Sequence, residues 1–170
     1  MSPVKLVQTF VTALQSGDMT LASNLTTDDF MLIGLLPHRL GKSEALAVQS
    51  ALLAAFPDFS YDLDDVRQEN GNVGALVSVA GTHTGTLSLP GGEVPEVRAS
   101  GLAIRLPQMR VVYRIAGDRV AAMLLESPPG GALNGLLQQV ATELRVARRE
   151  RIVSDPAYEE GSGRLPDVEG

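Results

Sequence analysis

The sequence predicts an α+β domain in which N-terminal helices pack against one face of a curved antiparallel sheet and enclose a conical pocket. Apolar residues recur with helical spacing over the first third of the chain, whereas from residue 60 onward they alternate with polar residues. Short turns join the alternating segments. Helices that precede an antiparallel sheet in this way are typical of α+β domains.

The first two helices are predicted near the N-terminus. Ser2 and Pro3 form a helix start, and apolar residues then recur on one face until Gly17 ends the run. Asp18 can cap a second, shorter helix. Residues 30–33 follow as a short buried strand.

A third helix is predicted after a loop. Pro37 and Gly41 break regular structure, so the segment between them should be irregular. Gly41 or Ser43 then opens a helix whose apolar residues repeat on one face as far as Phe56. Pro57 closes this helix because proline cannot continue the pattern of backbone hydrogen bonds.

Two strands joined by a tight turn are predicted next. Residues 60–68 and 73–84 alternate between apolar and polar side chains, and Asn70-Gly71 between them is a strong hairpin signal. A loop rich in glycine and proline covers roughly residues 87–107, with some extended structure near its end. The two strands should therefore form an antiparallel pair.

A second hairpin completes the predicted sheet. Residues 108–115 and 119–126 alternate in the same way, and Gly117-Asp118 supplies the turn between them. All the predicted helices up to this point precede the two hairpins, which supports the α+β assignment.

The C-terminal part of the chain predicts an extra helix and a tail. An apolar stripe from about residue 132 to 151 needs a partner, which is either this domain or a second subunit. The predicted organisation is a domain over residues 1–128, an accessory helix over 129–153 and a flexible acidic tail over 154–170.

Composition excludes several functional classes. A chain of 170 residues with 44% hydrophobic and 20% charged residues suits a single globular domain. The net charge of −6 disfavours nucleic-acid binding, which needs clustered lysine and arginine. No cysteine is present, and two histidines are too few for a multi-histidine metal site. There is no secretory signal and no apolar run long enough to span a membrane, so we expect a cytoplasmic protein.

Three motifs carry a resemblance to a known family. They are Ala-Phe-Pro-Asp-Phe at 55–59, Gly-Thr-His-Thr-Gly at 81–85 and Tyr-Arg-Ile-Ala-Gly-Asp-Arg-Val at 113–120. In order and spacing they resemble the SnoaL-like polyketide cyclases, within the nuclear transport factor 2-like superfamily of cystatin-like α+β folds. The resemblance covers about residues 4–127 and implies the curved sheet and conical pocket.

The catalytic residues of the characterised cyclases do not match this sequence. In those cyclases a histidine on the penultimate strand and an aspartate at the end of the last strand carry the acid and base steps. The matching positions here are about Val111 and Pro128. The resemblance therefore implies the fold without the family's mechanism.

Two residues are candidate catalytic groups. His83 shares a strand face with Val77 and Val79, where an imidazole could act as acid or base, although it could instead bond a loop backbone for structural reasons. Glu126 shares the parity of Leu124, and a carboxylate in an apolar pocket would have a raised pKa. The alternative for Glu126 is a solvated position at the rim.

Five residues are candidates for substrate binding. Tyr113 is predicted on the same strand face as Met109 and Val111, where its hydroxyl could orient a ligand carbonyl or bond a core partner. Leu124 is predicted to face inward from the last strand. His38 lies in a loop near the expected mouth of the pocket, where it could contact ligand or be a plain surface residue.

These residues support two functions. The first is a cyclase-like or isomerase-like enzyme that acts by proton transfer on a small apolar carbonyl compound, with His83 and Glu126 as the acid and base. The second is a non-catalytic ligand-binding or dimerisation module. Neither requires a cofactor or a metal. The resemblance also implies a homodimer formed through the outer face of the sheet, where Arg110, Val112 and Arg114 are expected.

Overall fold

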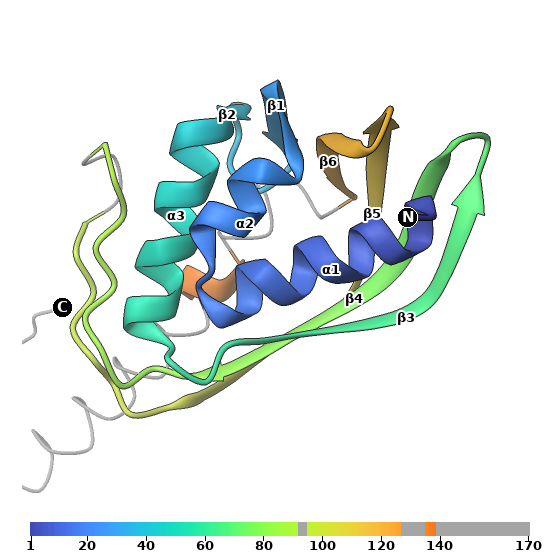
Figure 1. Ribbon diagram of the computed structural model, residues 1–170. Coiled ribbons are helices and arrows are strands. Elements are labelled where there is room, and N and C mark those ends of the chain that lie inside the picture. The colour runs from blue at the N-terminus through green and yellow to red at the C-terminus, as the bar shows by residue number, and fades with distance from the viewer. Residues whose placement is uncertain (92–94, 127–134, 139–170) are drawn as a thin grey trace, which may run out of the picture.

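The computed structural model describes residues 1–91, 95–126 and 135–138. Within this part of the chain, α1, α2 and α3 lie on one face of a curved six-stranded sheet (Figure 1). The helices are α1 (Pro3–Ser16), α2 (Met19–Asn24) and α3 (Lys42–Ala55). The strands are β1 (Thr26–Ile33), β2 (Leu40–Gly41), β3 (Ser60–Glu69), β4 (Asn72–Thr82), β5 (Ala103–Ala116) and β6 (Arg119–Glu126). The predicted α+β fold class is confirmed.

The predicted capping residues are found at both ends of α1 and at the start of α2. The Ser2 hydroxyl accepts a hydrogen bond from the Lys5 backbone N–H at 3.2 Å. Gly17 ends α1 with a φ of 82°, a left-handed conformation that glycine adopts at little cost. The Asp18 carboxylate then accepts from the Leu21 N–H at 3.1 Å and caps α2.

The sheet is mixed, which corrects the predicted antiparallel sheet. Its strand order is β2-β1-β6-β5-β4-β3, and β1 runs parallel to β6, while the other neighbours are antiparallel. The chain leaves β1 for α3 and for the three-strand meander β3-β4-β5, and only then returns in β6 beside β1. Because no short turn joins β1 to β6, the sequence contains no turn motif that would reveal their parallel pairing.

Strand β5 begins earlier than the alternation predicted. It starts at Ala103 rather than at residue 108, so the preceding loop is shorter than expected. Pro107 stands inside the strand, at an irregularity where the pairing with β4 shifts between Val77 and Val79. A bulge accommodates proline because the missing N–H removes no regular ladder hydrogen bond there.

Hydrogen bonds join the end of α3 to the end of β4. The backbone N–H groups of Thr84 and Gly85 both donate to the Ala55 carbonyl, at 3.1 and 3.0 Å. The Asp58 carboxylate accepts from the Thr82 N–H and from the Thr82 hydroxyl, each at 2.7 Å. These bonds satisfy a carbonyl at the helix end that would otherwise lack an intrahelical partner.

Phe56 packs between two residues of the same strand end. The His83 imidazole stacks on the Phe56 ring with a centroid separation of 5.0 Å and an interplanar angle of 23°. A Cβ at Gly81 would come within 3.1 Å of the Phe56 Cβ, so a larger residue would be crowded there. We refer to the contact of residues 55–59 with residues 81–85 as the interlock.

Most of the predicted accessory helix over 132–151, and all of the predicted tail over 154–170, lie outside the described residues. The part that is described, residues 135–138, is helical, and Leu136 is buried in the core of this domain. None of the helices in the described ranges is long and apolar enough to cross a membrane.

Gly85→Ala should weaken the interlock. An added Cβ would overlap the Ala54 backbone carbonyl, which cannot move without distorting α3. We expect the free energy of unfolding, measured by urea denaturation, to fall by about 1–3 kcal/mol, as for other overpacked sites. Gly135→Ala is the matched control because, apart from its chain neighbours and its own helix backbone, no atom of the described residues lies within 4 Å of the added Cβ. Equal stability of the two variants would contradict the proposed steric role.

Candidate functional site

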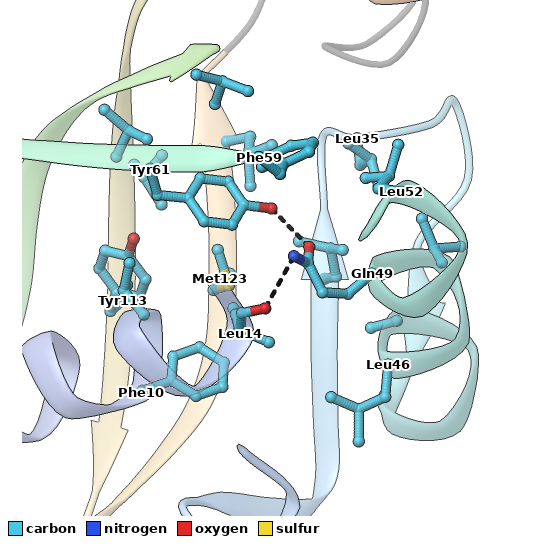
Figure 2. A pocket seen from close by; sticks show the side chains of 18 of the residues that line it. Phe10, Leu14, Leu35, Leu46, Gln49, Leu52, Phe59, Tyr61, Tyr113 and Met123 are labelled. Carbon is cyan, nitrogen blue, oxygen red and sulfur yellow. Dashed lines mark hydrogen bonds between the residues drawn. The ribbon is translucent and has the colours of Figure 1, made fainter. Parts of the chain in front are cut away.

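A cavity of about 90 Å³ lies between the helices and the concave face of the sheet (Figure 2). Its walls are predominantly aliphatic and aromatic. Side chains from α1, α3, β1 and β3 to β6 contribute, and Leu136 forms part of the wall. Apolar lining residues include Phe10, Leu14, Leu32, Val48, Leu52, Phe59, Val77, Val79, Met109, Val111, Met123 and Leu125.

Five lining residues carry polar side chains: Thr26, Lys42, Gln49, Tyr61 and Tyr113. Within the part of the chain that the structure describes, no aspartate, glutamate or histidine lines the cavity. The same described residues contain no cluster of three or more acidic or histidine side chains that could hold a metal ion.

Thr26 and Lys42 form polar contacts with the protein itself. The Thr26 hydroxyl lies 3.1 Å from the Ala22 carbonyl oxygen and 3.0 Å from that of Ser23. The Lys42 ammonium donates to the Thr26 carbonyl at 3.2 Å and lies 3.9 Å from the exposed Asp28 carboxylate. These two residues therefore have partners without a ligand.

Gln49 and Tyr61 form a directed hydrogen-bond chain. The Gln49 Nε2 donates to the Leu14 carbonyl at 3.1 Å, and the Tyr61 hydroxyl donates to Gln49 Oε1 at 2.6 Å (Figure 2). Burial raises the pKa of the Tyr61 phenol well above its usual value, and the Gln49 bond opposes this only in part. The phenol therefore stays protonated at neutral pH.

The Tyr113 hydroxyl is the one polar lining group without a hydrogen-bond partner among the described residues. Tyr113 is only 1% exposed, and its hydroxyl points into the cavity (Figure 2). Burial, and to a lesser extent the neighbouring Tyr61, raise the pKa of the phenol far above its usual value. Tyr113 thus presents a neutral O–H donor to an apolar space, where an unmet hydrogen bond is costly.

Three of the predicted substrate-binding residues line this cavity. Tyr113, Met109 and Val111 project from the concave face of β5, as their shared parity on the strand requires. Their contact with a ligand stays a prediction. The structure therefore brings together the predicted polar anchor and two apolar neighbours.

The last strand presents a different face from the one predicted. Leu125 pairs with Val111, and Met123 pairs with Tyr113, so the odd-numbered residues of β6 line the cavity. Leu124 does not. The reversal arises at a bulge, because consecutive residues of β5 pair with Ala122 and Val120 and leave one extra residue between them.

The same bulge places Glu126 on the outer face of the sheet, away from the cavity. Its side chain is 59% exposed and its carboxylate lies 3.6 Å from the Arg110 guanidinium, which also bonds Glu69 at 2.7 Å. Of the two positions considered for Glu126, inward or solvated, the structure shows a solvent-exposed one.

His83 is fully buried, yet it lies in the interlock rather than in the cavity wall. Its Nδ1 accepts from the Ser100 backbone N–H at 3.3 Å and lies 2.9 Å from the Ser100 hydroxyl. Since Nδ1 accepts a backbone N–H, the proton of the neutral ring is on Nε2, which has no hydrogen-bond partner among the described residues. Burial lowers the pKa of His83, since the charged imidazolium would lose its hydration.

His38 is exposed in the loop after β1 and is not among the residues that line the cavity. That loop contributes Leu35 to the wall instead. The predicted catalytic pair and His38 are therefore not brought together with Tyr113.

Sequence reasoning missed Gln49 and overlooked Tyr61. Gln49 interrupts the apolar face of α3, one turn from Ala45 and from Leu52, and a polar residue at such a position signals a buried hydrogen bond. Tyr61 lies in a segment of plain alternation, which carries no signal beyond that of a strand. The partner that gives it a role, Gln49, is twelve residues away in another element.

Comparison with known proteins places the chain within a family. The family model of the SnoaL-like polyketide cyclases matches residues 4–123. No curated protein matches the chain.

Several solved structures have the same fold. IdmH from Streptomyces antibioticus, named as a candidate polyketide cyclase, is 20% identical over 80% of this chain and 99% of its own, with a TM-score of 0.61. AclR from Streptomyces galilaeus, named as a candidate hydroxylase, is 17% identical; the match covers 81% of this chain and 94% of AclR, with a TM-score of 0.61. TsrD from Streptomyces laurentii is 20% identical; the match covers 80% of this chain and 92% of TsrD, with a TM-score of 0.60. At these identities the likeness shows the fold alone.

The stability of the protein should fall on acidification partly because of His83. The folded-state pKa of this imidazole lies below its unfolded value of 6.5, so its contribution is complete above pH 6.5 and is lost as the pH falls toward the folded pKa. Between pH 7.5 and 5.5, His83→Phe should lose less unfolding free energy than the wild type, as measured by urea denaturation. NMR should show a neutral Nε2-protonated ring at pH 7. A charged His83 at that pH would contradict this assignment.

Proposed function

This chain belongs to the SnoaL-like polyketide cyclase family, and on that premise we propose that it is a small-molecule-binding protein whose cavity takes a compact apolar carbonyl compound. The single observation that carries this proposal is the hydroxyl of Tyr113, which faces the cavity and has no hydrogen-bond partner among the described residues, although Tyr113 is only 1% exposed. A ligand carbonyl would accept from this hydroxyl. The surrounding apolar walls would bury the rest of the ligand.

The size of the cavity limits the ligand. An engineered apolar cavity of about 150 Å³ holds one benzene molecule, and the cavity here measures about 90 Å³. The cavity is therefore smaller than one that holds benzene, so a single small ring is the upper limit for the ligand and requires some outward movement of the lining side chains. This restriction supports a ligand with a single compact apolar body and few polar atoms.

A cyclase-like or isomerase-like enzyme is the second candidate function. Tyr113 favours it, because a phenol that donates to a carbonyl also stabilises the oxyanion that forms when a neighbouring C–H bond loses its proton. The predicted acid and base are absent from the cavity, since Glu126 lies on the outer face and His83 in the interlock. The geometry of the described residues therefore supports ligand binding better than proton transfer by these two groups.

Tyr113→Phe should weaken ligand binding without weakening the fold. We expect the dissociation constant of cyclohexanone, measured by ligand-observed NMR, to rise about threefold to tenfold, the cost of one lost hydrogen bond. The free energy of unfolding should stay constant or rise, because the deleted hydroxyl has no hydrogen-bond partner in the part of the chain that the structure describes. Unchanged affinity for cyclohexanone would overturn the role of Tyr113.

The homodimer and the cytoplasmic location stay predictions. Dimerisation through the outer face would bring together Val112 and its neighbours Arg110 and Arg114, which share that face. We expect light scattering of the purified protein to give twice the mass of the chain. A monomeric mass would contradict the dimer and would leave the cavity unaffected, because none of these residues lines it.

A further inference from the structure

The hydrogen-bond chain through Gln49 determines that the Tyr61 hydroxyl donates to Gln49 and does not accept from it. The Leu14 carbonyl can only accept, so the Gln49 amide must turn its NH₂ group toward it. The amide oxygen then faces Tyr61, and this oxygen also can only accept. The Tyr61 hydroxyl therefore uses its one proton on Gln49, at 2.6 Å.

A tyrosine whose proton is committed offers only its oxygen lone pairs to a second partner. Tyr61 lines the cavity, and Figure 2 shows its hydroxyl at the cavity edge, bonded to Gln49. Tyr113, which lines the same cavity, has no hydrogen-bond partner for its hydroxyl among the described residues and keeps its own proton free. The cavity thus presents an acceptor at Tyr61 and an available donor at Tyr113.

We infer that the ligand class is a hydroxy-carbonyl compound, with its carbonyl bound by Tyr113 and its hydroxyl donating to the Tyr61 oxygen. This inference rests on the proposed binding function and adds Tyr61 and Gln49 as specificity-determining residues. A compound with acceptors alone would gain nothing at Tyr61, because two oxygens without a proton between them repel. Gln49 acts through Tyr61 and need not touch the ligand.

Substituted cyclohexanones test the inference because they vary one group at nearly constant size. The probes are the 2-, 3- and 4-hydroxycyclohexanones, the methylcyclohexanones with the same substitution, cyclohexanone itself and 1,4-cyclohexanedione. Dissociation constants are measured by ligand-observed NMR. In the wild type, at least one hydroxy isomer should bind about threefold to tenfold more tightly than its methyl counterpart, and more tightly than the dione.

Three variants separate the parts of the site. Tyr61→Phe should abolish the preference for the hydroxy isomer over its methyl counterpart, because the oxygen that accepts the ligand hydroxyl is removed. Tyr113→Phe should weaken all the ketones and keep that preference. Gln49→Met frees the Tyr61 proton, so affinity for the dione should rise relative to the hydroxy isomer. Thr12→Val, which removes a hydroxyl from the exposed side of α1, is the control and should change nothing.

The outcomes distinguish this inference from the proposed function. If cyclohexanone binds the wild type but no hydroxy isomer exceeds its methyl counterpart, the hydroxy-carbonyl inference is overturned and the binding function stands. A preference that survives Tyr61→Phe would also overturn it. If none of the ketones binds, the proposed function falls, and the inference with it. The wild-type comparison decides the question even where a variant fails to fold.

Discussion

The interlock of residues 55–59 with residues 81–85 is the contact on which the cavity depends. It fixes the carboxyl end of α3 to the end of β4 through hydrogen bonds to the Ala55 carbonyl and through the stacked rings of Phe56 and His83. The amino end of α3 follows β2, which pairs with β1. Because the helix is held at both ends, it stays above the concave sheet, and the cavity lies in the space below it.

The polar groups of the cavity differ in what they leave to a ligand. Thr26 and Lys42 have hydrogen-bond partners within the protein. Tyr61 donates its hydroxyl proton to Gln49, and Gln49 donates an amide proton to the Leu14 carbonyl, so neither of these protons is available to a ligand. The Tyr113 hydroxyl bonds none of the described residues, so its donor and its lone pairs remain available. In an apolar cavity such a group favours a ligand that completes its hydrogen bond, which makes recognition depend on very few atoms.

One extra residue in β6 decides which side chains can take part in chemistry. Without the bulge, alternation from the buried Val120 would carry Leu124 and Glu126 to the concave face. With it, Met123 and Leu125 lie there, and Glu126 pairs with Arg110 on the outer face. The cavity consequently has two apolar side chains where it would otherwise have one apolar side chain and a carboxylate.

The sequence by itself determined the helices, the strands of both hairpins and the inward face of β5, because capping residues, turns and apolar periodicity act over a few neighbouring positions. It also marked 55–59 and 81–85 as motifs, but it did not show that they bind each other. Only the tertiary structure decided the parallel pairing of β1 with β6, the bulge that moves Glu126 outward and the bond between Tyr61 and Gln49. Each of these depends on contacts between distant segments, for which no local pattern exists.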